Sequence, residues 1–340
     1  MIPSKGPLPG RKFILDIRGL RVQFFLSEGI VTALDGVDLT IYDKETVGIV
    51  GETGCGKSMT AFSILRLVPR PGRITAGSIR FKGNELLKLT NEQMRSVRGK
   101  RISMIFQDPA TALDPVFTIG SQLGEVISLH QGIYDQAKLN AKIVQILSLV
   151  KIADPKNVMK QYPHELSGGM KQRVMIALAL SCSPALLIAD EPTTALDVTI
   201  QAQILNLLKD LARKTGSSMM LITHNLGVVA ETCDRVCIMY AGRIVEEAET
   251  FELFARPLHP YTMGLLSAFP KLGEKKEELA VIRGTVPNLM TPFPGCSFVD
   301  RCDRASDLCA SKKPTRLEVS PGHFVSCHMY QVGGEKPSDQ

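Results

Sequence analysis

One glycine-rich segment, Gly51 to Ser58, limits the folds that are open to this chain. It has the form G-x-x-x-x-G-K-[ST], the phosphate-binding loop, which is credible only between a buried strand and a helix. The residues Val47 to Val50 are apolar enough for that strand, and Met59 to Leu67 fit the helix. The segment therefore predicts an α/β domain that binds a nucleoside triphosphate.

The chemistry of a bound triphosphate explains the residue types in this loop. Gly51, Gly54 and Gly56 let the backbone pass close to the phosphates, and backbone N–H groups and the positive end of the following helix point at phosphate oxygens. Lys57 adds a positive charge for the β- and γ-phosphates. The hydroxyl of Ser58 is a hard oxygen ligand that suits Mg²⁺.

Composition sets the wider limits. With 340 residues, the chain can form one large domain and an appendage. It has no run of eighteen apolar residues, so we expect no membrane-spanning helix, and the residues before Lys12 lack the apolar core of a signal peptide. The net charge of +6 could suit anionic nucleotides or a membrane surface, but it is mild for this length and more typical of a solvated surface. We expect no nucleic-acid partner.

Alternating apolar residues precede the loop in three runs, 13–17, 20–24 and 37–41. A period of two is typical of half-buried strands, so we predict three strands in an antiparallel sheet packed on the nucleotide-binding core. Phe24 or Phe25 could stack on adenine, because an aromatic ring offers a flat face to a base. Either residue could equally belong to the core.

Two further segments end at positions suited to ligand contact. Residues 101–106 read as a strand that delivers Gln107, whose amide can bind Mg²⁺ or orient water. Leu166-Ser167-Gly168-Gly169-Met170 precedes an alanine-rich helix that runs to about Leu180. Ser-Gly-Gly at a helix start presents free N–H groups and a hydroxyl to an anion, although an ordinary helix cap has the same composition.

Acidic and imidazole side chains close two more apolar strands. Ala185 to Asp190 ends in a carboxylate, and Glu191 follows at once. Asp190 can hold Mg²⁺ through water, and Glu191 can accept the proton of an attacking water. Residues 218–223 form the next strand, which delivers His224 to the sheet edge where ligands bind in such folds.

Taken together, these residues resemble the nucleotide-binding subunit of an ABC transporter over residues 13–255. Six motifs occur in the family's order. They are Walker A (51–58), the Q-loop (Gln107), the signature (166–170, with Met170 in place of the usual glutamine), Walker B with its catalytic glutamate (186–191), the D-loop (195–197) and the switch histidine (His224).

The resemblance implies a P-loop NTPase fold with a parallel core sheet, an antiparallel subdomain and a helical signature subdomain. It implies that two such domains dimerise head to tail, with each ATP held between one subunit's Walker A and the other's signature. Catalytic roles are implied for Glu191, His224, Gln107 and Lys57, and Mg²⁺ is implied at Ser58, Gln107 and Asp190. The residues implied to contact ATP are Gly51, Glu52, Thr53, Gly54, Cys55, Gly56, Lys57, Ser58, Met59, Phe24, Asp190, Ser167, Gly168 and Gly169.

The composition changes after residue 255, so we divide the chain into a lead-in (1–12), an ATPase domain (13–255) and a C-terminal extension (256–340). Prolines and glycines cluster in the extension and periodicity fades. His259-Pro260-Tyr261 and the later cysteines resemble the C-terminal extension of ATPases that serve oligopeptide and dipeptide importers. This resemblance implies two membrane permease subunits, a second related ATPase or another copy of this chain, and indirectly an extracellular peptide-binding protein. It places the chain on the cytoplasmic face of the membrane.

Four cysteines of the extension, Cys296, Cys302, Cys309 and Cys327, have the spacing C-x5-C-x6-C-x17-C. Four thiolates can hold a 4Fe-4S cluster or a structural Zn²⁺, and a small irregular segment gains stability from such a staple. Zinc sites favour short C-x2–4-C knuckles, which are absent here, so the wider spacing and the family resemblance favour the cluster. Two disulfides or free thiols are the remaining alternatives.

Other functions remain open within and beyond this family. Closely similar ATPases serve importers of nickel or another small solute, and the substrate is chosen by other chains. A soluble ABC ATPase that acts on DNA or ribosomes usually has two cassettes or a long coiled coil, whereas this sequence has one P-loop and no sustained heptads. We therefore expect an ATPase that powers peptide import.

Overall fold

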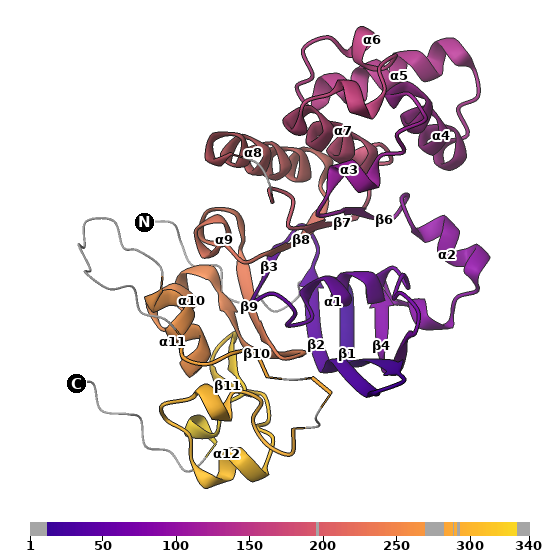
Figure 1. Ribbon diagram of the computed structural model, residues 1–340. Helices are drawn as coiled ribbons and strands as arrows, with labels where there is room; N and C mark the ends of the chain where they lie inside the picture. Colours follow the sequence, from indigo (N-terminus) through magenta and orange to yellow (C-terminus); the bar gives the residue numbers. More distant parts are fainter. Residues whose placement is uncertain (1–11, 195–196, 269–281, 288, 291–292, 332–340) are drawn as a thin grey trace.

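The computed structural model describes residues 12–194, 197–268, 282–287, 289–290 and 293–331. The expected lead-in lies outside these residues except for Lys12, as do Ala195 and Leu196 of the expected D-loop. The described chain forms one large sheet, a smaller antiparallel sheet and a helical lobe on the opposite side of the large sheet (Figure 1). The predicted division into a parallel core, an antiparallel part and a helical part is confirmed.

The large sheet has eight strands in the order β11-β12-β10-β9-β3-β8-β7-β6. The five neighbouring strands β9, β3, β8, β7 and β6 run parallel to one another. The remaining three strands, β10, β12 and β11, pair antiparallel. β9 and β10 form an antiparallel hairpin that turns at Ala241 and Gly242. The strands are β3 (Thr46–Val50), β6 (Ile102–Ile105), β7 (Leu186–Asp190), β8 (Ser218–Thr223), β9 (Arg235–Tyr240), β10 (Arg243–Glu249), β11 (Leu317–Ser320) and β12 (His323–Val325).

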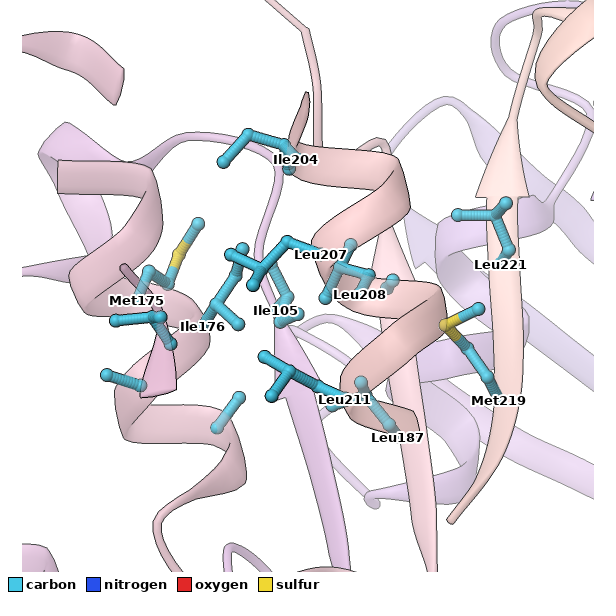
Figure 2. Packing of buried hydrophobic residues seen from close by; sticks show 14 of the residues in the cluster. Ile105, Met175, Ile176, Leu187, Ile204, Leu207, Leu208, Leu211, Met219 and Leu221 are labelled. Atoms are coloured by element: carbon cyan, nitrogen blue, oxygen red, sulfur yellow. The ribbon is translucent and has the colours of Figure 1, made fainter. Parts of the chain in front are cut away.

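Alternate residues of the central strands feed two separate cores. In β7, Leu186 and Ile188 face the antiparallel sheet, whereas Leu187 and Ala189 face the helical lobe. All are fully buried, which is why the strand is apolar throughout instead of alternating. Figure 2 shows the helical side of this division, where Leu187 lies among apolar side chains of α7 and α8.

The antiparallel sheet differs from the sequence prediction in its number of strands. The first two predicted strands are one long strand, β1 (Phe13–Leu26), which pairs with β2 (Gly29–Tyr42) and β4 (Gly72–Phe81), and β5 (Asn84–Glu85) lies at the edge. The register shifts between Ile17 and Leu20, where Gly19 has a φ of 55°. This bulge changes the phase of the apolar alternation, and the prediction read the change as a strand boundary.

The helices cover both faces of the large sheet, and α8 buries one apolar face. Ile204, Leu207, Leu208 and Leu211 of that helix are buried against α7 and the sheet (Figure 2). No helix among the described residues is long and apolar enough to cross a membrane. The α-helices are α1 (Lys57–Ile64), α2 (Asn91–Val97), α3 (Pro109–Ala112), α4 (Ile119–Gln131), α5 (Gln136–Leu149), α6 (Pro155–Val158), α7 (Gly168–Leu180), α8 (Val198–Thr215), α9 (Leu226–Thr232), α10 (Thr250–Ala255), α11 (Pro260–Ser267) and α12 (Asp307–Ser311).

The C-terminal extension is joined to the large sheet through its backbone. β12 pairs with β10, and β11 adds a further strand, so the sheet continues into the extension (Figure 1). Buried Glu246 of β10 accepts hydrogen bonds from the backbone N–H groups of Leu258 and His259, and its Oε1 lies 2.8 Å from Nε2 of His323. The extension is therefore built onto the domain and shares its sheet.

Candidate functional site

The phosphate-binding loop joins β3 to α1, as the sequence predicts. Gly56 caps α1 with a φ of 108°, a conformation that favours glycine. Gly51 leaves no space for a side chain, because a Cβ there would lie 2.1 Å from the carbonyl oxygen of Met239. The end of β9 therefore packs directly against the loop at Gly51.

Two polar side chains at the start of α1 are already held in place. Lys57 is 5% exposed, and its Nζ donates to the carbonyl oxygens of Gly51 at 2.7 Å and Glu52 at 3.0 Å. Ser58 donates from Oγ to Oδ1 of Asp190 at 3.0 Å. Burial raises the pKa of the Asp190 carboxyl, and the hydrogen bond from Ser58 opposes that shift. The structure therefore brings the two predicted Mg²⁺ ligands Ser58 and Asp190 into contact.

Three of the predicted catalytic side chains meet at the ends of three neighbouring strands. Glu191 accepts a hydrogen bond from Nε2 of Gln107 at 3.1 Å, and its other oxygen lies 3.3 Å from Nδ1 of His224. The hydroxyl of Thr194 also donates to Glu191, at 3.0 Å. Sequence reasoning did not single out Thr194. Its position three residues after the glutamate, in the turn that follows β7, is the one signal that could have indicated it.

The signature segment begins a helix, as predicted. Ser167 caps α7 by accepting a hydrogen bond from the N–H of Met170 at 3.4 Å, and Ser167 and Gly168 are exposed. Figure 1 shows α7 in the helical lobe, away from α1 and the phosphate-binding loop. The structure therefore does not bring the signature and the loop of one chain together.

One buried amide connects α7 to the Walker B segment and was not anticipated. Gln172 is 2% exposed, and its Nε2 donates to the carbonyl oxygen of Pro192 at 2.6 Å. Pro192 directly follows Glu191. A glutamine among the buried and otherwise apolar positions of α7 was the available sequence signal.

The two candidates for adenine stacking lie on opposite faces of β1. Phe24 is partly buried and packs against Gly72, where a Cβ would come within 2.7 Å of the ring. Phe25 is 42% exposed, and the guanidinium of Arg73 lies 5.7 Å from its ring centroid. Core packing thus accounts for the position of Phe24, and its contact with adenine stays a prediction.

The four cysteines of the extension line one cavity of about 240 Å³. His259, Phe298 and His328 contribute to the same wall. The backbone N–H of Cys296 donates to the carbonyl oxygen of Cys309 at 2.7 Å, which ties two of the four together. All eight cysteines of the chain are described and are free thiols, so the structure contains none of the disulfides that were one alternative.

The thiols of this cavity lie in an environment that disfavours isolated thiolates. Burial raises the pKa of Cys296 and Cys302, and it raises the pKa of Cys327 to about 11. Within the described residues, no group of three or more Cys, His, Asp or Glu side chains is arranged to hold a metal ion. The four cysteines share the lining of this one cavity.

Comparison with protein families gives two matches along the chain. Residues 34–194 match the ABC transporter family, and residues 245–309 match the C-terminal region of oligopeptide and dipeptide transporters. The second match covers the start of the extension and three of its four clustered cysteines.

Several curated proteins are similar over nearly the whole chain. A probable peptide ABC transporter ATP-binding protein, y4tR of Sinorhizobium fredii, is 52% identical, and the match covers 94% of this chain and 96% of that protein. The oligopeptide transport ATP-binding protein AppD of Bacillus subtilis is 47% identical, with 96% and 99% covered.

Among solved structures, the ATP-binding cassette MJ0796 in a dimeric post-hydrolysis state, bound to ADP and Pi, matches with a TM-score of 0.63. It is 26% identical, and the match covers 69% of this chain and 98% of that chain.

Proposed function

This chain belongs to the family of ATP-binding subunits of oligopeptide and dipeptide ABC transporters, and we propose that it powers the import of di- and oligopeptides across the cytoplasmic membrane. The observation that carries the ATPase part is the arrangement of Gln107 and His224 around the Glu191 carboxylate, next to a complete phosphate-binding loop. The peptide part is supported by the match of the extension to oligopeptide and dipeptide transporters and by the similar proteins, which are named as peptide and oligopeptide transport ATP-binding proteins.

In the proposed mechanism, Glu191 accepts the proton of the attacking water while Gln107 and His224 hold its two oxygens in place. His224 also contacts the γ-phosphate. Lys57 is released from the carbonyl oxygens of Gly51 and Glu52 to the β- and γ-phosphates, and the free N–H groups of the loop and of the α1 terminus bind phosphate oxygens. Ser58, Asp190 and Gln107 would hold Mg²⁺, which supplies further positive charge to the phosphates when bound.

The separation of the signature from the loop within one chain supports action between two chains. We propose that Ser167, Gly168 and Gly169 contact the ATP bound to the other subunit of a head-to-tail pair, with their exposed helix terminus stabilising negative charge. The partner is a second related ATPase or another copy of this chain. The pair would sit at the cytoplasmic face of the membrane on two permease subunits, and an extracellular binding protein would deliver the peptide.

The substrate class can be tested on the assembled transporter, reconstituted in liposomes with its binding protein. We expect short peptides to raise the rate of ATP hydrolysis several-fold and free Ni²⁺ to leave it unchanged, because the proposed coupling makes hydrolysis depend on delivery of a peptide. Stimulation by Ni²⁺ alone would reassign the chain to a metal importer. A basal rate that no solute changes would contradict the coupling.

For the cysteine cavity, we propose a 4Fe-4S cluster bound by Cys296, Cys302, Cys309 and Cys327. Four thiols that line one cavity of about 240 Å³ can surround a bulky cluster, and their spacing lacks the short C-x2–4-C knuckles that structural Zn²⁺ sites favour. The cluster would supply a structural link between the segments that carry the four cysteines. We assign it no step in ATP hydrolysis.

Anaerobic purification followed by iron and sulfide analysis tests this assignment. We expect about four irons and four sulfides per chain with broad visible absorbance. Replacing Cys302 by Ser should remove most of both, whereas Cys182→Ser, outside the cavity, should leave the content unchanged. One zinc per chain and no colour would replace the cluster by a zinc site.

A further inference from the structure

An arginine of the extension reaches the phosphate-binding loop. Arg301, directly before Cys302, forms a two-pronged ion pair with Glu52, with Nη1–Oε2 and Nη2–Oε1 distances of 2.9 and 3.1 Å. The Arg301 side chain is 6% exposed and that of Glu52 is 26% exposed. Two parallel charge-assisted hydrogen bonds fix the direction of the carboxylate as well as its position.

Glu52 is held at its backbone as well as at its carboxylate. Its N–H donates to the hydroxyl of Tyr261 at 3.0 Å, and its carbonyl oxygen accepts from Nζ of Lys57. Tyr261 is the last residue of the His-Pro-Tyr motif, so the extension contacts this single loop residue from two places. The position of Glu52 in turn fixes one of the two carbonyl groups that hold the Lys57 ammonium.

An aromatic cluster joins these contacts to the cysteine cavity. Tyr240, Tyr261 and Phe298 are almost fully buried, with ring centroids 4.7 to 5.4 Å apart. The Arg301 guanidinium lies 5.7 Å from the ring centroid of Tyr240 and 5.9 Å from that of Phe298. Phe298 also lines the cavity. Arg301 is therefore packed between the cavity wall and the loop.

The ion pair between Arg301 and Glu52 has an electrostatic consequence for the binding of a triphosphate. A carboxylate in a loop that binds a triphosphate repels the ligand unless a nearby cation compensates it, and the repulsion is strong where water is partly excluded. Arg301 supplies that cation from outside the loop. Without it, the Glu52 charge would be uncompensated and the carboxylate free to turn toward the phosphates.

We propose that Arg301 and Tyr261 of the extension are positioning residues of the ATP site, which hold Glu52 so that the phosphate-binding loop and Lys57 are arranged for ATP. The inference rests on the proposed ATPase function and adds residues outside the ATPase domain to its site. It follows that the extension sets the affinity of this subunit for ATP, whatever its role toward other subunits.

The test measures Mg·ATP affinity by calorimetry, and steady-state hydrolysis, on the full chain. We expect Arg301→Met to raise Kd and KM for ATP about tenfold while kcat changes by less than about twofold, since a lost charge-assisted pair acts on binding and not on the water. Arg301→Lys should recover part of the loss. Tyr261→Phe, which removes the acceptor of the Glu52 N–H, should weaken binding in the same direction.

A double variant separates this role from general damage. In Glu52→Gln with Arg301→Met no uncompensated carboxylate remains, so binding should be tighter than in Arg301→Met alone. The matched control is Arg316→Met, which breaks another ion pair between extension and domain, Arg316–Glu247 at 3.0 Å, and should leave ATP affinity unchanged.

Distinct outcomes would overturn the inference. Wild-type affinity in Arg301→Met, an equal loss in Arg316→Met, or a double variant as weak as the single one would each contradict it. If Arg301→Met does not fold, the same comparison is made with Arg301→Lys and Tyr261→Phe. Failure of the wild-type chain to bind Mg·ATP would instead refute the proposed function itself.

Discussion

Replacing Glu191 by Gln is expected to slow ATP hydrolysis by about 10²- to 10⁴-fold and to leave ATP affinity nearly unchanged. The glutamine keeps the shape of the side chain and can still contact Gln107, Thr194 and His224, which surround this position. It cannot accept a proton from water. The loss therefore falls on kcat and not on binding.

The matched control for this variant is Glu92→Gln, an exposed carboxylate on α2. It should hydrolyse ATP at the wild-type rate. Near-normal steady-state hydrolysis by Glu191→Gln would refute the assignment of Glu191 as the base and would shift attention to His224. A loss of ATP binding together with hydrolysis would mean that Glu191 acts mainly in building the site.

Replacing Gly51 by Ala is expected to lower the free energy of unfolding by about 3 kcal/mol and to abolish measurable ATP binding. An alanine Cβ would lie 2.1 Å from the carbonyl oxygen of Met239 and 2.7 Å from Sγ of Cys55. The first contact is with the backbone of β9, so no side chain can rotate to relieve it. The loop or the strand must move, and either movement displaces Lys57.

Gly54→Ala provides the comparison, since a Cβ at Gly54 would meet nothing within 4 Å. Its cost comes from the φ of 82°, which strains an L-residue by about 1 to 2 kcal/mol. Denaturant unfolding of both variants should therefore rank Gly51→Ala as the less stable. Equal stability would show that the close approach to Met239 does not constrain the loop.

The sequence alone was sufficient for the core of the fold, because local pattern and burial agree there. The strands that end at Val50, Asp190 and Thr223 are short apolar runs followed by polar ligands, and parallel pairing then brings those ends together. The long strand β1 was divided in two because its bulge at Gly19 reverses the apolar alternation. In a single sequence, a bulge that shifts the apolar alternation gives the same pattern as a boundary between two strands.

The extension could not be predicted in the same way. β12 is only three residues long, which is too short for an apolar period that would distinguish a strand from a loop. It becomes a strand because β10 offers an unpaired edge, which is a property of the assembled sheet. The contacts of Arg301 and Tyr261 with Glu52 likewise span 249 and 209 residues, a separation at which spacing carries no information.

The candidate site was predicted as a set of residues and not as a network. Gln107, Glu191 and His224 were each identified from a strand end, yet their mutual hydrogen bonds depend on the order of β6, β7 and β8 in the sheet. Thr194 and Gln172 were missed because threonine and glutamine are common on surfaces. Only the three-dimensional structure identifies them, because it places Thr194 in hydrogen-bond contact with Glu191 and Gln172 in hydrogen-bond contact with Pro192.

The central claim, that this chain hydrolyses ATP with Glu191 as the base, is tested most directly by identifying the nucleotide bound after incubation with Mg·ATP. The full chain is incubated, freed of unbound nucleotide and extracted. We predict that Glu191→Gln retains intact ATP, whereas the wild-type chain yields ADP. Equal amounts of ADP from both proteins, or no bound nucleotide in either, would contradict the account.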